Sequence, residues 1–179
     1  MITEKKTRYF SSGFKIAIVI SLIVLLASAL LWANYAALTA TPTQAQHATQ
    51  TITSERQTAT WQGIFLNNLR ASWFLIVPVL GLAVFFFIWY NTATILGLES
   101  AYYNVNASLV VLLTLGVGAL EIAAYIIAFA ENLYIIYLAV ANLGAIKRIK
   151  TQSWKTWITY ALLLLIAAIV EAGLISRGL

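Results

Sequence analysis

The sequence contains no cysteine and a single histidine, which excludes disulfide bonds, thiolate chemistry and cysteine-based metal sites. Charged residues are also scarce: they make up 9% of the chain, against about a quarter in a typical soluble domain. The sequence shows no glycine-rich phosphate loop, no pair of histidines and no nucleophile–base arrangement. We therefore expect a protein that is not an enzyme and that binds no cofactor or metal ion.

Hydrophobic residues dominate what remains: they account for 61% of the 179 residues, and the mean hydropathy is +0.86. A chain with so few charges cannot cover a globule with polar surface, so its solvent is a lipid bilayer. The net charge of +5 comes from basic residues grouped beside apolar segments. That placement sets membrane topology and gives no reason to expect nucleic acid as a partner. Residues 1–179 are therefore interpreted as a single integral membrane domain.

Long apolar runs predict an all-α fold, a polytopic transmembrane helical bundle. The first run follows a basic N-terminus, and we interpret it as an uncleaved helix rather than as a secretory signal with a cleavage site near 27–29. In the second run, Pro78 and Gly81 lie early and are expected to bend the helix. About five spans are predicted: 14–38, 71–98, 107–129, 132–146 and 157–176.

The division of 107–146 rests on length and charge. A single helix of this length would measure roughly 60 Å, about twice the membrane core. We place the turn at Glu131–Asn132, and a re-entrant pair of helices is the alternative. Two basic groups, near the N-terminus and at 147–155, should both face the cytoplasm, which requires an even number of intervening spans. The N-terminus is then cytoplasmic and the C-terminus extracytoplasmic.

Two segments between the first spans are predicted to lie outside the membrane core. Residues 39–60 are rich in Thr, Gln and Ala without an apolar period, which indicates an exposed extracytoplasmic loop. In 61–70, Trp61, Ile64, Phe65 and Leu69 share one helical face, as in an interfacial amphipathic helix.

Several polar residues fall in or beside the predicted spans. A carboxylate at bilayer depth needs a partner, so Glu121 is expected to face the bundle interior near Glu171. Arg70 is the candidate counter-charge. Such residues act either as hydrogen-bonding contacts between helices or as a cavity for a proton, an ion or a headgroup. The predicted outer-side cluster consists of Glu121, Glu171, Arg70, Asn68, Asn67 and Glu131.

Three stretches resemble the stage II sporulation protein M family, also known as DUF95: "IFLNNLRASW" with "YNTATILG", "GALEIAAYIIA", and "LLIAAIVEAGLIS". The resemblance covers about 60–176. The chain departs from the family pattern at Val117 (His in the family), Ala123 (Pro) and Thr92 (Gly), so a role that depends on that His is not implied here. The resemblance assigns the family's polar and glycine positions to Asn68, Arg70, Asn91, Gly97, Gly118, Glu121 and Glu171. Asn91 and Gly97 are then expected on the inner side, and Gly118 and Pro78 in helix packing.

The resemblance implies a plasma-membrane protein without assigned catalysis, because the family comprises multi-helix membrane proteins and its sporulation member works in a cell-wall-remodelling complex. We expect a non-catalytic subunit or scaffold of an envelope complex. Its partners would be membrane lipids and other membrane protein subunits, a second copy of itself included. The alternative is a transporter subunit, half of a dimer resembling the ABC-2 permeases, that uses the intramembrane glutamates.

Overall fold

The computed structural model describes residues 11–177, and every regular element in this range is helical. The all-α membrane fold predicted above is confirmed, since four helical stretches are long and apolar enough to cross a bilayer: α1, α4, α6 and the run Ala145–Ile175. The elements are α1 (Ser12–Thr39), α2 (Pro42–Gln57), α3 (Trp61–Ser72), the 3₁₀ helix η1 (Trp73–Ile76), α4 (Leu80–Tyr102), α5 (Ala107–Val117), α6 (Ala119–Val140), α7 (Ala145–Arg148), the π-helical η2 (Ile149–Ser153) and α8 (Trp154–Ile175).

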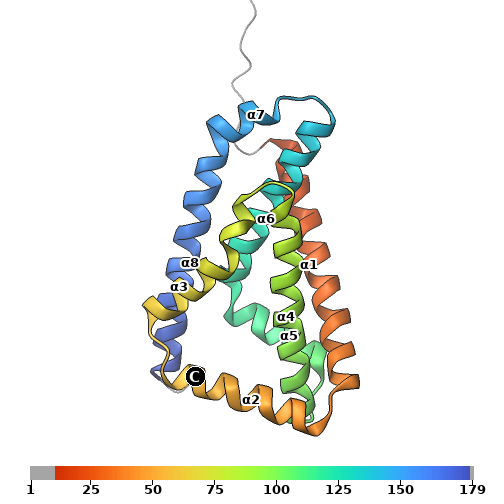
Figure 1. Cartoon of the computed structure of the whole chain (residues 1–179), viewed down its shortest axis with the longest axis vertical. Helices are drawn as coiled ribbons and strands as arrows, with labels where there is room; N and C mark the ends of the chain where they lie inside the picture. The colour runs from red at the N-terminus through yellow and green to blue at the C-terminus, as the bar shows by residue number, and fades with distance from the viewer. Residues whose placement is uncertain (1–10, 178–179) are drawn as a thin grey trace, which may run out of the picture.

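The helices form five legs that alternate in direction (Figure 1). Starting at the end of the molecule that holds α7, the chain descends in α1, ascends in α3 and η1, descends in α4, ascends through α5 and α6, and descends in α8. The lower end carries α2, which lies across the bundle. We call this the α2 end and the opposite one the basic end, because Lys15, Lys147, Lys150 and Lys155 belong to the elements that meet there.

The predicted span 71–98 is wrong in its bounds, because this region contains two legs. The reversal lies between η1 and α4, at Pro78. Proline cannot continue a hydrogen-bonded helix, and the next residue, Val79, has a φ of 70°, which is rare for a β-branched side chain. Pro78 and Gly81 therefore reverse the chain and do not merely bend it. We call the resulting unit, α3–η1–α4, the hairpin.

The tip of the hairpin is held against the middle of the bundle. The side-chain amide of Asn132 on α6 donates a hydrogen bond to the Leu75 carbonyl in η1. A Cβ built on Gly81 would lie 2.6 Å from both the Leu75 oxygen and the Asn132 amide nitrogen, so the site has no room for a side chain. Close packing at the tip thus requires glycine at this position.

The predicted turn at Glu131–Asn132 is wrong as well. Both residues are buried within α6, which runs unbroken to Val140. The interruption in 107–146 falls instead at Gly118, which ends α5 and begins α6. Glycine is a poor helix former, and Gly116 lies only two residues earlier, so the helix is weakest here. The predicted spans 107–129 and 132–146 are therefore replaced by one ascending leg, residues 107–140, which is broken at Gly118 and followed by a turn at 141–144.

These two corrections offset each other, so the number of legs stays at five, although the leg formed by α3 and η1 is not among the four helices of membrane-spanning length. They do move residues between the two ends. α1 and α4 run parallel. Two hydrogen bonds show this, since Leu25 pairs with Trp89 (2.8 Å) and, further along both helices, Trp32 pairs with Thr94 (2.8 Å). The loop after α4 therefore lies at the α2 end, beside α2, and not at the basic end.

Within the segment 39–60, where an exposed loop was predicted, residues Pro42–Gln57 form the helix α2. The side chain of Thr41 accepts from the Gln44 backbone N–H, the side-chain oxygen of Gln44 accepts from the Thr41 backbone N–H, and Pro42 occupies the first turn. This capping box and proline start α2 at the end of α1. Most of α2 is exposed, as expected, and Ala45 and Thr49 are the positions that it buries.

The predicted helix at 61–70 is present as α3, but its apolar face points inward. Phe65 and Leu69 pack against the main hydrophobic core, which is built from α1, α4, α6 and α8. Trp61 remains exposed at the start of the helix, and Gln62 is exposed too. α3 thus serves as the ascending leg of the hairpin.

Candidate functional site

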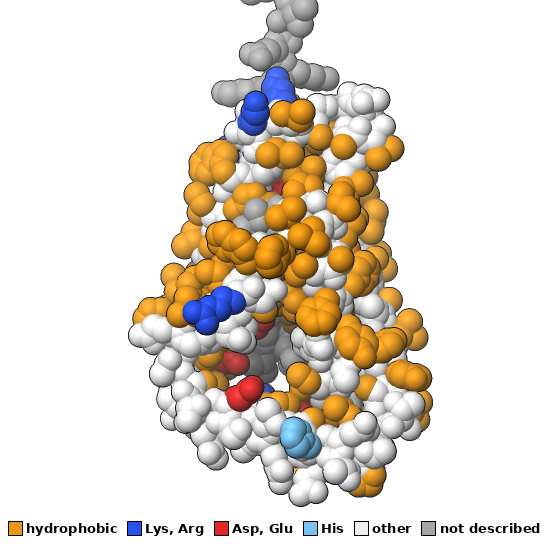
Figure 2. Space-filling view, in the orientation of Figure 1, with side chains coloured by type: hydrophobic (Ala, Val, Ile, Leu, Met, Phe, Trp, Pro, Cys, Tyr) orange, Lys and Arg blue, Asp and Glu red, His pale blue; other side chains and the backbone are white. Residues whose placement is uncertain are grey.

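A cavity of about 560 Å³ lies at the α2 end and contains the two carboxylates predicted to meet, Glu121 and Glu171. The first turn of α6 and the last turns of α8 supply them. Arg56, from the last turn of α2, lines the same cavity. The space-filling view shows a hollow above α2 with acidic side chains around it (Figure 2). The remaining lining residues are Leu113, Thr114, Gly118, Leu120, Ala167, Val170, Leu174 and Ile175.

The break at Gly118 gives this cavity its shape. It lets α5 leave the axis of α6, so that α5 forms one wall and α8 the other. Glu121 follows the break directly and is half-buried, with its Oε1 accepting a hydrogen bond from the Tyr125 hydroxyl at 2.7 Å. The predicted inward orientation of Glu121 thus has a local cause in the break before it.

Arg56 supplies the positive charge of the cavity lining and lies close enough to attract Glu171 and also Glu99 of α4, which is not a lining residue. Glu121 and Glu171 share the cavity, where two ionised carboxylates would repel each other. Sequence reasoning missed Arg56, because 39–60 was interpreted as a loop. The signal that could have revealed it is helical spacing: Ala45, Thr49, Ile52 and Arg56 recur at i, i+4, i+7 and i+11 and share one face.

The hairpin residues of the predicted cluster do not line the cavity. Asn67 and Arg70 are exposed on α3, and Asn68 is half-buried, with its backbone carbonyl accepting from the Ser72 hydroxyl. Arg70 was expected to neutralise the carboxylates, but Arg56 occupies that place. The apolar face of α3 turns toward the core, which directs the polar face of this helix away from it.

A row of buried hydroxyl groups leads from the cavity into the bundle. Tyr125, which donates a hydrogen bond to Glu121, lies near Tyr160 of α8. The Tyr160 hydroxyl shares a hydrogen bond with Ser72 of the hairpin. This row joins α3, α6 and α8. Its last member, Tyr160, lies one helical turn from Thr156 on α8.

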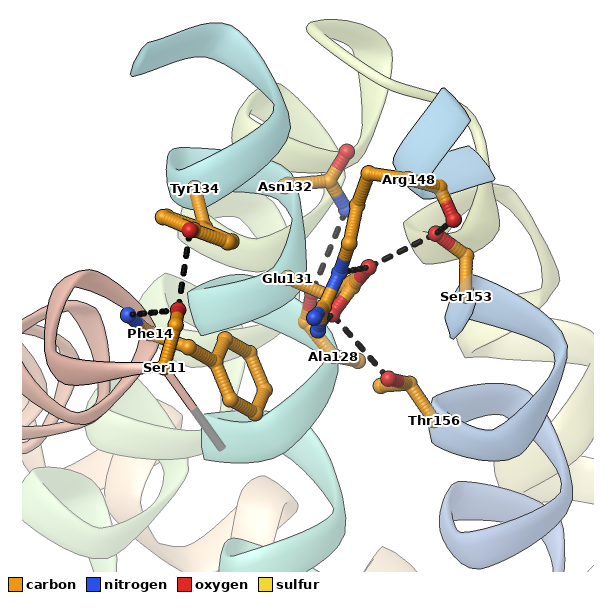
Figure 3. Close-up of polar contacts among 9 residues, drawn as sticks. All are labelled: Ser11, Phe14, Ala128, Glu131, Asn132, Tyr134, Arg148, Ser153 and Thr156. Carbon is orange, nitrogen blue, oxygen red and sulfur yellow. Dashed lines mark hydrogen bonds and ion pairs between the residues drawn. The ribbon is translucent and has the colours of Figure 1, made fainter. Parts of the chain in front are cut away.

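Glu131 belongs to a second polar centre near the basic end, separate from the cavity (Figure 3). Its two oxygens receive Arg148 Nε at 2.9 Å and Nη2 at 2.6 Å. Ser153 and Thr156 of the next leg add hydroxyl donors at 2.7 Å and 3.0 Å. Glu131 is 0% exposed and Arg148 7%. We call these four residues the buried ion-pair centre.

The shape of the chain around Arg148 makes this centre possible. The π-helical turn Ile149–Ser153 widens the helix between α7 and α8, so that Ser153 points back toward Glu131. The Arg148 guanidinium also lies over the rings of Phe14 (4.8 Å) and Tyr134 (5.2 Å). Arg148 therefore ties α1 and α6 together through charge, hydrogen bonds and ring contacts, and Glu131 extends the centre to α8 through Thr156.

The remaining predicted positions have packing and turn roles. Asn91 is exposed and bonds to the Phe87 carbonyl within α4. Gly97 packs so closely on α1 that a Cβ at this position would collide with the Ala33 carbonyl oxygen and lie 2.7 Å from the Ala36 side chain. Because these α1 residues lie toward its C-terminal end, Gly97 lies near the α2 end of the molecule. Gly118 ends a helix, and Pro78 makes the turn of the hairpin.

Chemically, the two sites differ. In the buried ion-pair centre, opposite charges and hydroxyl groups satisfy one another, which suits a structural contact. In the cavity, two carboxylates face one guanidinium in open space, and the walls are apolar. That combination suits binding of a group that carries positive charge and apolar surface.

Membrane-length helices packed around a buried ion pair, with a polar helix across one end, define a polytopic membrane protein. A family model described as stage II sporulation protein M matches residues 15–175, and the chain belongs to this family. The resemblance seen in 60–176 is thereby confirmed and extends through α1. No curated protein and no solved structure matches the chain significantly.

Proposed function

We propose that the protein is a non-catalytic subunit of a membrane complex, in which α2 is the platform that holds an extracytoplasmic partner. The observation that carries this proposal is α2 itself. A helix that is polar on nearly all sides has little reason to fold unless it bridges to something else. Here it is capped, ordered and held across the bundle, with one row of side chains turned inward.

The outer face of α2 offers polar side chains for such a partner. His47, Gln50 and Ser54 lie opposite the inward row and are exposed. The charges of the protein agree with an extracytoplasmic location. Basic residues gather at the opposite end, and basic loops face the cytoplasm in membrane proteins. The N-terminus is then cytoplasmic, and the C-terminus lies on the α2 side of the plasma membrane.

A photo-crosslinking residue placed at Gln50 tests the platform in cells. The matched control carries the same residue at Thr151, which is exposed at the basic end. A partner on the platform gives a protein adduct at Gln50 and none at Thr151. A protein adduct at Thr151 with only lipid or no adduct at Gln50 would contradict the platform.

A transporter subunit is the second candidate, and the row Glu121–Tyr125 with Ser72–Tyr160 favours it, since hydroxyl and carboxyl groups within a bundle can relay a proton. A permease of the ABC-2 kind needs a cytoplasmic ATPase. The Thr151 crosslink is where that ATPase would be captured, so the same experiment separates the two functions.

A further inference from the structure

The cavity at the α2 end combines features that belong to an amphiphile-binding site. Its volume of about 560 Å³ falls within the range of about 300–1,000 Å³ typical of small-molecule pockets. Two carboxylates and a guanidinium sit on apolar walls, so a ligand with separate positive and negative groups can satisfy both. A ligand with one charge alone would leave a group of the cavity unmatched.

The walls are open to the surrounding lipid. Leu113 on α5 and Val170 on α8 line the cavity and are 62% and 44% exposed. They lie on helices that the cavity separates, and α5 is only 11 residues long. A chain of methylene groups can therefore leave the cavity between these walls without crossing a polar surface.

The charged groups of the cavity gather toward the α2 end of the molecule. Arg56 comes from the polar helix α2, at the end of the bundle. Glu171 precedes the end of α8 by four residues, or about 6 Å along the helix. Leu113 and Val170 line the cavity beside these charges and are exposed on the apolar surface of the bundle. Charged groups that can contact a headgroup and exposed apolar side chains that can contact an acyl chain thus line one cavity.

We propose that this cavity binds the headgroup of a phospholipid that carries a primary ammonium, with the ammonium between Glu121 and Glu171 and the phosphate beside Arg56. A primary ammonium donates three hydrogen bonds, which two carboxylates can accept. A quaternary ammonium keeps the charge but donates none. A headgroup with a phosphate and no ammonium matches Arg56 alone and faces two carboxylates of its own sign.

Lipid binding in the cavity and partner binding on α2 use different faces of this helix. Arg56 belongs to the inward row, whereas His47, Gln50 and Ser54 face outward. Loss of the partner would leave lipid binding intact. Loss of lipid binding would leave the crosslink at Gln50 intact. The two proposals can therefore fail separately.

Native mass spectrometry of the purified protein tests this proposal, with phosphatidylethanolamine, phosphatidylcholine and phosphatidylglycerol of identical acyl chains as probes. We expect phosphatidylethanolamine to bind at least about tenfold more tightly than the other two, which corresponds to about 1.4 kcal/mol. Glu171→Gln and Arg56→Gln should each remove most of this preference. The matched controls are Glu55→Gln and Arg70→Gln, which remove the same charges from exposed positions outside the cavity.

Two results would overturn the proposal. One is equal affinity for the three lipids in the unaltered protein, or equal loss in the cavity variants and their controls. The other is soluble phosphoethanolamine binding as tightly as the lipid, which would assign the site to a water-soluble ligand. Arg56→Gln alters an exposed side chain of α2, so its result is interpretable even if Glu171→Gln fails to fold.

Discussion

Removal of Arg148 should destabilise the protein strongly, because it would strand the Glu131 carboxylate in the interior. The guanidinium supplies two charge-assisted hydrogen bonds, at 2.9 Å and 2.6 Å, to a side chain that is 0% exposed. After Arg148→Met, only the hydroxyls of Ser153 and Thr156 would face the carboxylate. Breaking a buried pair from one side typically costs about 3–5 kcal/mol.

The double variant Glu131→Met with Arg148→Met separates the pair from the rest of the site. It removes the stranded charge and leaves two unbranched apolar side chains of comparable length in its place. We expect it to recover at least about 2 kcal/mol relative to the sum of the two single changes, since residues in direct contact couple by about 0.5–3 kcal/mol. Recovery will be incomplete, because the contacts of the guanidinium with Phe14 and Tyr134 are also lost.

The assay is reversible unfolding in mixed micelles, followed by helical circular dichroism against the mole fraction of denaturing detergent. Lys150→Met is the matched control, since Lys150 is an exposed cation at the same end. Its free energy of unfolding should change by less than about 0.5 kcal/mol. A loss below about 1 kcal/mol for Arg148→Met, or strict additivity in the double variant, would refute the assignment of Arg148 as the residue that neutralises Glu131.

Three further outcomes are expected. Gly97→Leu should lower the free energy of unfolding by about 1–3 kcal/mol, because the side chain would meet the α1 backbone; Gly173→Ala, where a Cβ has open space, should be neutral in the same assay. Asn132→Leu should cost about 1–2 kcal/mol by releasing the hairpin tip, and limited proteolysis should then cut within the hairpin. A cysteine at Asn104 should react with an impermeant thiol reagent from the side opposite to one at Thr151; labelling of both from one side would contradict the parallel arrangement of α1 and α4.

The sequence was sufficient to predict a helical membrane bundle and the meeting of Glu121 with Glu171. Apolar length identifies a spanning helix with little help from tertiary contacts, because an unpaired backbone is excluded from the bilayer core. Glu171 lies near the end of the last helix, where its position in the sequence places it, but Glu121 lies in the first turn of α6, which runs opposite to α8, and not near the end of a helix parallel to it. The apolar length of a helix is a property of a single segment, so it can be predicted from the sequence of that segment alone.

The turns were harder to predict, since they depend on partners distant in the sequence. Glu131 suggested a turn because an isolated carboxylate is costly within a span. The residue that neutralises it, Arg148, lies 17 residues later in the sequence. The π-helical turn after Arg148 brings the partners of Glu131 together. Gly118 was the better local signal, since it interrupts the helix without requiring any partner. At Pro78 the sequence indicated a bend, and the full reversal depends on Asn132 holding the tip.

The start of α2 was within reach of sequence reasoning. Thr41, Pro42 and Gln44 form a recognisable helix start, but the low apolar content of the segment favoured a loop. With α2 assigned as a loop, Arg56 could not be placed, and Arg70 became the nearest available cation. The error in one element thus carried over into the candidate site.

The pinned hairpin has a consequence for the order in which the chain can reach its final form. During synthesis, Ser72 and Leu75 leave the ribosome well before their partners, since Asn132 lies 57 residues after Leu75 and Tyr160 lies 88 residues after Ser72. The hairpin tip therefore has nothing to hold it while the first half of the chain is being made. Its final position is fixed only when α6 and α8 arrive, so a chain that stops after α4 would expose an unanchored tip to quality-control proteases. For this protein, completion of the last helix is therefore the step that fixes the position of the hairpin tip.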